Sequence, residues 1–408
     1  MAILLLPFSV AVYAQSAEVL KNKISQKDLD IQELEKEIAI YQNQLDTIGE
    51  QKSSLNSSLK ELDLIKKKLN ADISVTQKKI DKTNFTIQNL SSDISDKQSN
   101  IVLNLESITA GIKKTNEFEE YTIVETLLSQ DDFTTVWNDV DNIVTVRENI
   151  RSDIKKLKQV KGELEDTRTL TVKAKNELTT LKTQLADQQK IVVQNTNNKN
   201  KLLKETKNSE ATYQKLLKDR LVKKEAFEKE LENYEAQLQF ILDPSKLPSG
   251  RVLSWPLDKI FVTSPYAPRW GGFHRGTDFR ASIGTQIKTV ADGTVIGTGD
   301  TDICCPGASF GKWIFIEHNN GLSSTYAHLS LISVSKGQKV ARGQVIGYSG
   351  NTGSSTGPHL HLSLYVSSGV KIDSFPSKSY PGKILVQPIS ATEAYLDPMS
   401  YLPFYLKP

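Results

Sequence analysis

Apolar side chains recur every seven residues through the first part of the chain. One series runs from Ile24 to Ile108 with lysine at only two positions, and a second, more often interrupted series runs from Ile143 to Ile241. A sustained seven-residue repeat is typical of coiled-coil helices, in which an apolar seam faces a partner helix. At about 1.5 Å per residue, the two arms would be about 130 Å and 150 Å long. Because these lengths are similar, residues 18–242 are predicted to form a long antiparallel coiled-coil hairpin.

Residues 117–142 interrupt the repeat and form the predicted tip of this hairpin. The segment is rich in bulky apolar groups, namely Tyr121, Leu127, Leu128, Phe133 and Trp137. Such groups fit two interpretations: a small cap that closes the coiled coil, or an exposed docking site for another protein.

Proline and glycine divide the chain into two parts. Of the 14 prolines, all except Pro7 lie at Pro244 or later, and only three of the 22 glycines precede that point. A proline in a helix interior costs about 3 kcal/mol, so the proline-free part can form uninterrupted helix. Residues 243–250 (DPSKLPSG) are predicted to be a linker. Residues 251–408 are predicted to form a β-rich domain, because short alternating runs are separated there by glycine turns.

The two ends of the chain carry weaker signals. From residue 251 onward, 14 Lys and Arg face 9 Asp and Glu, which suits an anionic partner surface such as a cell wall. No nucleic-acid partner is expected. Residues 1–14 (MAILLLPFSVAVYA) are too few to span a bilayer core of about 30 Å and are predicted to be a signal peptide. The chain is therefore expected to be extracytoplasmic, with a short retained anchor as the alternative.

The two cysteines, Cys304 and Cys305, are neighbours in the sequence. Adjacent Cα atoms lie about 3.8 Å apart, so only a vicinal bridge could join them, and they cannot cross-link distant parts of the fold. An ordinary loop is expected here, with a metal or redox role as the alternative.

Four of the five histidines occur in spacings that are meaningful together. His274 and Asp278 lie four residues apart in HRGTD. His359 and His361 lie two residues apart in HLHLSLYV, where apolar and polar residues alternate. Residues two apart on a strand share a face, so both imidazoles of the second motif can enter one site. Two histidines and one carboxylate form a three-ligand zinc set that leaves a position open for water. His328 lies between the two motifs, in TYAHLS.

These motifs resemble the lysostaphin/LytM-type zinc peptidases. The matching stretches occur in the order of that family: HRGTD, ADGTVIG, STYAHLS, GQKVARGQVIGYSGNTGSSTGPHLHLSLYV and LDPMSYLP. The resemblance implies a β-rich antiparallel domain that hydrolyses peptide bonds of peptidoglycan with one Zn²⁺. It implies His274, Asp278 and His361 as metal ligands and His328 and His359 as the catalytic pair. It leaves open which of the two is the general base, and it implies a structural role for His318.

The helical part resembles the EnvC-like and PcsB-like regulators of division hydrolases. This likeness implies a role in cell-wall remodelling or division, and a division-associated membrane ABC transporter as a partner at the hairpin tip. Two other functions remain open: a non-catalytic EnvC-like activator of a separate murein amidase, and a scaffold whose peptidase domain only binds the wall.

Two segments depart from the pattern of the peptidase family. Residues 299–313 (GDTDICCPGASFGKW) and 367–395 are longer than expected and could shape the substrate groove. The hairpin is expected to return the early helix to the peptidase domain, where it could cover the groove and restrain the enzyme. The alternative is that the hairpin is only a spacer.

Overall fold

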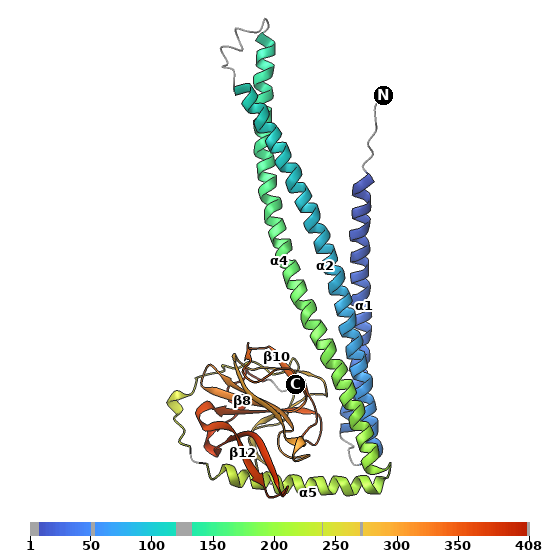
Figure 1. Ribbon diagram of the computed structural model, residues 1–408, viewed down its shortest axis with the longest axis vertical. Helices are drawn as coiled ribbons and strands as arrows, with labels where there is room; N and C mark the ends of the chain where they lie inside the picture. Colours follow the sequence, from blue (N-terminus) through green and yellow to red (C-terminus); the bar gives the residue numbers. More distant parts are fainter. Residues whose placement is uncertain (1–7, 50–53, 120–132, 239, 270–271, 406–408) are drawn as a thin grey trace. The chain divides into compact units, whose positions relative to one another are not determined.

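The computed structural model describes residues 8–49, 54–119, 133–238, 240–269 and 272–405 (Figure 1). The long helices are α1 (Phe8–Gly49), α2 (Leu55–Glu119), α4 (Phe133–Thr206) and α5 (Glu210–Glu235). The strands are β1 (Val262–Ser264), β2 (Ala267–Arg269), β3 (Gly272–His274), β4 (Thr277–Arg280), β5 (Gln286–Lys288), β6 (Gly293–Asp300), β7 (Lys312–His318), β8 (Leu322–Ile332), β9 (Lys339–Val340), β10 (Val345–Ser349), β11 (His359–Val366), β12 (Val370–Ser377), β13 (Lys383–Ser390) and β14 (Tyr395–Leu396). The predicted class, long helices followed by a β-rich domain, is confirmed.

Neither arm is one uninterrupted helix, although the proline-free sequence would allow it. In the first arm α1 ends at Gly49 and α2 begins at Leu55, where the Ser54 side chain accepts a hydrogen bond from the Ser57 N–H at 3.1 Å. In the second arm α4 ends before Lys207 and Asn208, whose φ values of 50° and 54° are left-handed. A new helix then starts behind the capping residue Ser209. The seven-residue repeat continues in the sequence across both helix ends. It depends only on which side chains are apolar and therefore cannot reveal where the backbone changes direction.

Met1–Glu33 and Ser74–Leu185 form one compact unit. In it α1 runs antiparallel to α2, because Asp30 pairs with Lys78 at 2.9 Å and Asp28 with Lys82 four residues further on. The helices α2 and α4 are also antiparallel, with hydrogen bonds joining residues 107 to 153 and 93 to 167. Several predicted seam positions are buried here: Ile31, Ile80, Ile108, Ile143 and Leu164. The unit therefore contains three helical segments, where the sequence predicted two arms.

The predicted tip and leader fall partly outside the described residues. Residues 120–132 of the tip and 1–7 of the leader are not described, so the docking site stays a prediction. In the part of the chain that the structure describes, no helix is both long and apolar enough to cross a membrane.

Leu34–Ile73 and Ala186–Pro408 form the second compact unit. Its β-rich part is a ten-stranded sheet in the order β1-β4-β11-β8-β7-β6-β9, to which β5, β10 and β14 add at the sides. Every recorded strand pair is antiparallel, with the hairpins β2–β3 and β12–β13 forming separate small sheets. Helical residues Ile65, Leu69 and Ile191 pack with Tyr348 of β10 in a small apolar cluster.

Strand alternation separates the core of this sheet from its chemically active face. On β11 the side chains of Leu360, Leu362 and Leu364 enter the main core. The residues between them, including His359 and His361, have the opposite orientation because successive side chains of a strand point to opposite faces. Burial of the leucines, at roughly 25 cal/mol per Å² of apolar surface, therefore also fixes the direction of the imidazoles.

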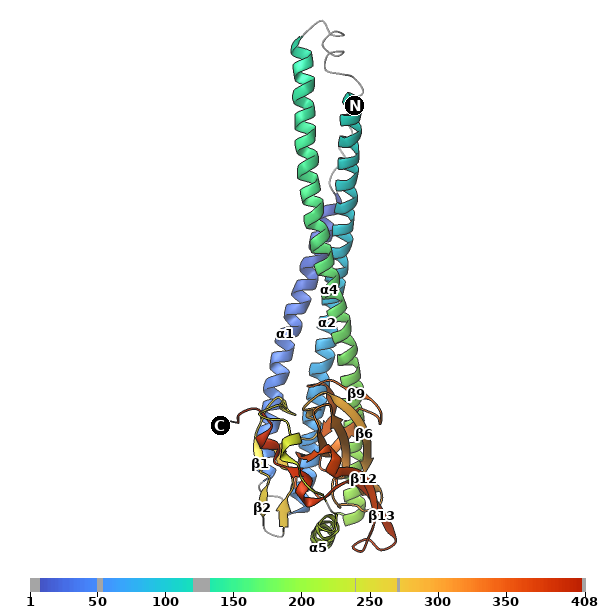
Figure 2. The ribbon, with the colours of Figure 1, turned by 90° about the vertical axis from the view of Figure 1, so that its left-hand side faces the viewer.

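The two predicted insertions and α5 form one apolar cluster, which we call the α5 seat. The seat joins Phe227 of α5 to Cys305 and Ala308 of the first insertion and to Phe375, Leu385 and Ile389 of the hairpin β12–β13, with Leu231 and Tyr234 of α5 at its edge. Figures 1 and 2 show α5 beside this hairpin. Phe227 and Tyr234 were predicted to continue the coiled-coil seam, and they contact the β domain instead.

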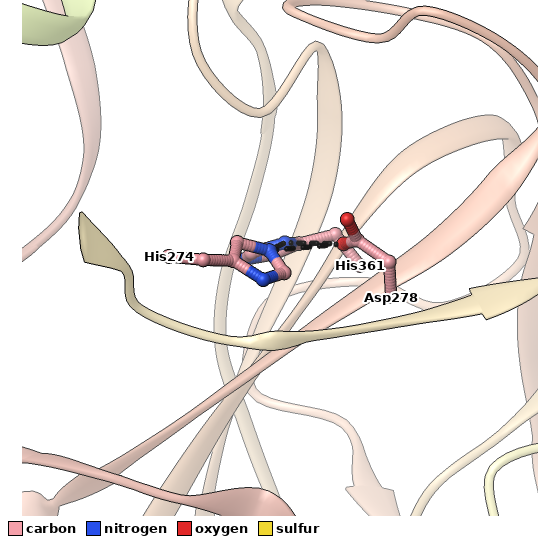
Figure 3. A group of neighbouring side chains, drawn as sticks. All are labelled: His274, Asp278 and His361. Atoms are coloured by element: carbon pink, nitrogen blue, oxygen red, sulfur yellow. Dashed lines mark hydrogen bonds and ion pairs between the residues drawn. The ribbon is translucent and has the colours of Figure 1, made fainter. Parts of the chain in front are cut away.

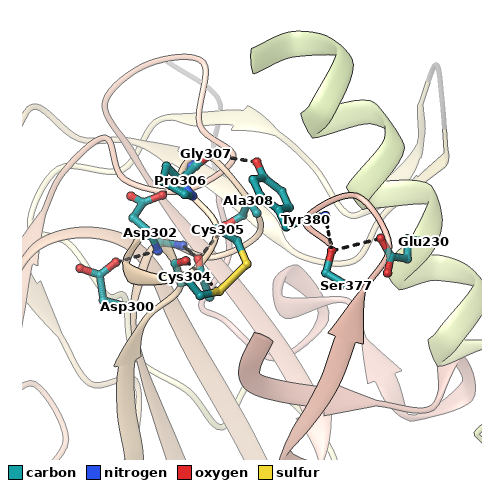
Figure 4. The surroundings of a disulfide bond; sticks show 12 residues. Glu230, Asp300, Asp302, Cys304, Cys305, Pro306, Gly307, Ala308, Ser377 and Tyr380 are labelled. Atoms are coloured by element: carbon teal, nitrogen blue, oxygen red, sulfur yellow. Dashed lines mark hydrogen bonds between the residues drawn. A yellow bond between two sulfur atoms is a disulfide. The ribbon is translucent and has the colours of Figure 1, made fainter. Parts of the chain in front are cut away.

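A disulfide between Cys304 and Cys305 lies in the seat (Figure 4). The cysteines are thus joined by the vicinal bridge, the one pairing that their spacing allows, where the sequence favoured an ordinary loop. Tyr380 holds the same loop by donating a hydrogen bond to the Pro306 carbonyl at 2.9 Å. Nearby, Glu230 of α5 accepts hydrogen bonds from the Ser379 N–H and hydroxyl, at 2.9 and 2.8 Å. Both insertions therefore support α5.

We expect Phe227→Ala to loosen α5 from its seat. Phe227 is fully buried, and truncation of a buried phenylalanine typically costs about 3–5 kcal/mol. Amide hydrogen exchange across residues 210–235 should become faster, while exchange in β11 stays slow. Leu221→Ala, at a half-exposed leucine of the same helix, is the matched control. Unchanged exchange in the Phe227→Ala protein would contradict this packing.

Candidate metal centre and groove

Three neighbouring elements bring the predicted metal ligands together. Asp278 on β4 and His361 on β11 are directly paired in the strand register, and His274 ends β3. The three side chains lie within one cluster, in which all the candidate ligand atoms are within 4.8 Å of one another (Figure 3). The Asp278 carboxylate lies 2.9 Å from His361 Nδ1 and 3.2 Å from His274 Nε2. The two imidazole nitrogens are themselves 3.1 Å apart.

Hydrogen bonds on the far side of each ring fix which nitrogen has a free lone pair. His274 Nδ1 lies 2.8 Å from the Pro265 carbonyl, which can only accept, so Nδ1 is protonated and Nε2 is free. The Ser363 hydroxyl donates to the Arg275 carbonyl at 2.9 Å and so accepts from His361 Nε2 at 2.8 Å. His361 Nδ1 is therefore the free nitrogen. Both lone pairs point into the cluster beside the carboxylate.

This donor set fits a zinc ion. Two imidazole lone pairs and a carboxylate oxygen repel one another unless a cation lies between them, and zinc favours such ligands. Zinc bonds of 2.0–2.1 Å in tetrahedral geometry place adjacent donors about 3.3 Å apart. The observed separations of 2.9, 3.1 and 3.2 Å are close to this value. The outer contacts to Pro265 and Ser363 are of the kind that orients metal-binding histidines.

His328 and His359 lie beside this cluster with matching orientations. His328 Nδ1 donates to the Thr352 carbonyl and His359 Nδ1 to the Gly357 carbonyl, at 2.8 and 2.7 Å. Each ring therefore has its Nε2 free, and the ring centroids are 4.6 Å apart. His359 Nε2 is 3.5 Å from the Asp278 carboxylate, so the pair adjoins the metal cluster without belonging to it.

A backbone irregularity aims His328 at the site. The residue has a φ of 61°, in the left-handed region, and the β7–β8 register shifts between Lys312 and Ile314, opposite it. A bulge of this kind re-aims a side chain that a regular strand would point elsewhere. The His328 N–H donates to the Phe310 carbonyl at 2.8 Å, which holds the strained position.

Burial favours the neutral form of two of the site imidazoles, His328 and His361. It lowers the pKa of His328 well below the ordinary histidine value, an effect increased by the neighbouring His359 and His361. Burial likewise lowers the pKa of His361. The pKa of Asp278 is held well below its usual range because contacts with His274 and His361 outweigh the opposing effect of burial. At neutral pH His328 and His361 are therefore neutral, and the Asp278 carboxylate is ionised.

Three supporting features were missed in the sequence. Ser363 follows His361 by two positions and shares its strand face, so the alternation of HLHLS could have indicated it. A Cβ at Gly276 would lie 2.5 Å from the His361 ring, so the glycine of HRGTD leaves room for that ring. The carbonyls of Thr352 and Gly357 left no sequence signal, because any residue supplies a carbonyl. His318, expected to be structural, bonds Ser324 at 2.8 Å and does not line the groove.

The groove in front of the site is lined on one side by α5. Three glutamates of one helix face, Glu228, Glu232 and Glu235, line it together with the four site histidines, Asp278, Arg269 and Arg275. Glu235 is buried and pairs with Arg275 at 3.2 Å, while Tyr395 donates to it at 2.6 Å. The early helix was expected in this position. The described groove is lined by the last long helix instead, whose Phe227 and Tyr234 pack in the α5 seat.

Comparison with known proteins identifies the β-rich segment. Residues 272–374 match the family model described as Peptidase family M23. Peptidoglycan DD-endopeptidase ShyA of Vibrio cholerae is 48% identical over 105 residues, 26% of this chain and 22% of that protein. DD-carboxypeptidase/endopeptidase Mpg of Neisseria meningitidis is 38% identical over 113 residues, 26% of this chain and 24% of that protein. Lysostaphin of Staphylococcus staphylolyticus is 39% identical over 99 residues, 24% of this chain and 20% of that protein. The chain thus spans about a quarter or less of the length of these curated relatives.

Substitution of the cluster and of its neighbours should separate metal binding from turnover. We expect His361→Ala and Asp278→Ala to lose zinc, because two remaining ligands hold the ion poorly. Ser363→Ala should weaken zinc affinity by about 10–100-fold, the usual effect of removing an outer-shell partner. His328→Ala should keep one zinc per chain. Elemental analysis of the dialysed proteins measures all four, and a metal-free His328→Ala protein would overturn this division.

Proposed function

We propose that the chain is a zinc-dependent endopeptidase acting on peptide bonds of bacterial peptidoglycan, since residues 272–374 match the model of Peptidase family M23. One observation carries the proposal: three metal-binding lone pairs and two free imidazole nitrogens converge on one groove. His274, Asp278 and His361 would hold the ion. The names of the curated relatives, one of them a peptidoglycan DD-endopeptidase, suggest the substrate class.

The histidine pair supplies the proton transfers of the proposed reaction. A bound zinc ion would polarise the scissile carbonyl and acidify the attacking water. The free Nε2 of His328 or His359 can accept a proton and return it to the leaving amine. Either ring can hydrogen-bond the developing oxyanion once its Nε2 carries a proton. Carbonyl bonds at Nδ1 leave the Nε2 of both rings available to accept that proton.

Two other functions make different predictions. A non-catalytic activator of an amidase needs no metal set, and a scaffold needs only to bind the wall. The complete donor cluster with its outer hydrogen bonds favours the enzyme. The proposed location outside the cytoplasm follows from this substrate. The predicted ABC transporter partner rests on the resemblance of the helical part alone.

A peptidoglycan zymogram of the full chain tests the enzyme. We expect a clearing band that a chelator abolishes and added Zn²⁺ restores. His328→Ala should give no band although the protein folds. Clearing that appears only when an amidase is added would support the activator, and wall binding without clearing would support the scaffold.

We further propose that α5 restrains this enzyme by occupying the groove. The helix is anchored by the α5 seat, and its glutamate face lines the space in front of the zinc cluster. In this proposal that face keeps a polymeric substrate out of the groove. Release of α5 is therefore the regulated step in this proposal, and the long helices that precede α5 are the element through which a partner would act.

Reversing a charge on α5 should raise activity. Glu232→Arg places a cation opposite Arg275, with which Glu232 now pairs at 3.6 Å. A destabilisation of docking by 1.4 kcal/mol would raise the released fraction by about tenfold. The matched control is Glu225→Arg, the same change at an exposed glutamate of α5 that does not line the groove. Rates of wall hydrolysis at equal concentration measure both, and equal rates for the two variants would refute the restraint.

Docking of α5 should weaken as the pH rises through about 7. Burial raises the pKa of Glu235 to about 7, against the lowering effects of Tyr395 and Arg275, and Glu232 adds to the rise. A carboxyl whose pKa is raised in the docked state favours docking most at pH below 4.5, and this contribution is lost as the pH rises through 7. Hydrogen exchange of residues 210–235, corrected for intrinsic rates, should show greater opening at pH 8 than at pH 5.5. Glu235→Gln should remove most of that dependence, and an unaltered dependence would contradict the assignment.

A further inference from the structure

Arg275 occupies an unusual position in the groove. It directly follows the proposed ligand His274, and its carbonyl accepts the Ser363 hydroxyl that holds His361. Its side chain is only 16% exposed, and its guanidinium lies 5.6 Å from the centre of the Tyr395 ring. The backbone and side chain are therefore held in place while the guanidinium lines the groove.

Both carboxylates with which Arg275 is seen to pair belong to α5. Its Nη1 is 3.2 Å from Glu235 and its Nη2 is 3.6 Å from Glu232. When α5 leaves, the Arg275 guanidinium loses both counter-ions and faces the open groove. An unpaired cation there attracts an anion that enters the groove.

An ordinary anchoring role accounts for Glu235 but poorly for Glu232. Glu235 is buried and accepts the Tyr395 hydroxyl, so it belongs to the packing of α5. Glu232 is 39% exposed and its ion pair is long, and such pairs contribute little to stability. Its carboxylate also approaches the backbone of β3, since a Cβ built at Gly272 would lie 3.3 Å from Glu232 Oε2. Glu232 thus places a carboxylate where a ligand of the groove would lie.

We propose that Arg275 is a specificity residue that binds a free carboxylate of the substrate peptide, and that Glu232 occupies this position in the restrained state. The inference rests on the proposed function, because peptidoglycan peptides carry free carboxylates on side chains and at chain ends. A guanidinium binds a carboxylate through paired N–H donors, a geometry that a carboxamide cannot reproduce with the same charge. The favoured substrates are therefore those whose carboxylates are not amidated.

Two synthetic cross-linked wall peptides of one sequence test this, one with free carboxylates and one with the same groups as carboxamides. Calorimetric titration into the full zinc-loaded chain measures binding, and hydrolysis of each peptide gives kcat/KM. We expect Glu232→Gln to strengthen binding of the carboxylate peptide about two- to fivefold, the range that so weak an ion pair allows, and to change that of the carboxamide peptide much less. Adding Arg275→Gln to this variant should abolish the preference, and Arg275→Lys should retain part of it. Arg342→Gln, the same change outside the groove, is the control and should leave both affinities unchanged.

The outcomes separate this inference from the function on which it rests. Equal affinity of the Glu232→Gln protein for the two peptides would refute it. Equal losses for both peptides in the Arg275→Gln protein would assign Arg275 a purely structural role and would refute it as well. If neither peptide is hydrolysed, the proposed enzyme fails, and the binding preference still decides whether Arg275 recognises a carboxylate.

Discussion

The convergence of three lone pairs on one point is the constraint on which the rest of the site depends. Neutral imidazoles and an ionised carboxylate do not stay 2.9–3.2 Å apart without a cation or proton between them. The direct pairing of Asp278 with His361 in the β4–β11 register creates this arrangement. A slip of one residue would turn the imidazoles of β11 toward the core and its leucines toward the groove. The same β4–β11 register therefore places the leucines in the apolar core and the ligands in the metal cluster.

This coupling explains how much of the site the sequence reveals. His359, His361 and Asp278 were found because alternation and short spacing are local properties that survive folding. The orientation of His328 was not predictable from a pattern, since it depends on a bulge whose left-handed residue is stabilised by the carbonyl of a distant loop. The same limit applies to the carbonyls that fix the tautomers. The sequence shows which residues are histidines, whereas backbone contacts between distant segments decide how each imidazole is oriented.

In the helical part the sequence predicts the type of element better than its partners. The seven-residue repeat correctly predicts long helices, yet it passes through the ends at Gly49 and Thr206. An apolar seam position requires only that the side chain be covered. Phe227 meets this requirement against Phe375 and the loop of the vicinal disulfide as well as it would against another helix. Periodicity therefore could not distinguish a coiled-coil residue from one that holds α5 on the β domain.

The two faces of α5 have separate physical roles, and this separation makes a releasable restraint possible. Apolar contacts in the α5 seat supply non-directional affinity, and the buried pair of Glu235 and Arg275 fixes the position of the helix. Glu232 adds little affinity but occupies Arg275. In the proposed mechanism a substrate carboxylate and α5 compete for the same guanidinium, so each would weaken the binding of the other by the same factor. A partner that draws α5 from its seat would then raise substrate affinity, and a high local concentration of wall peptides would favour release without any partner.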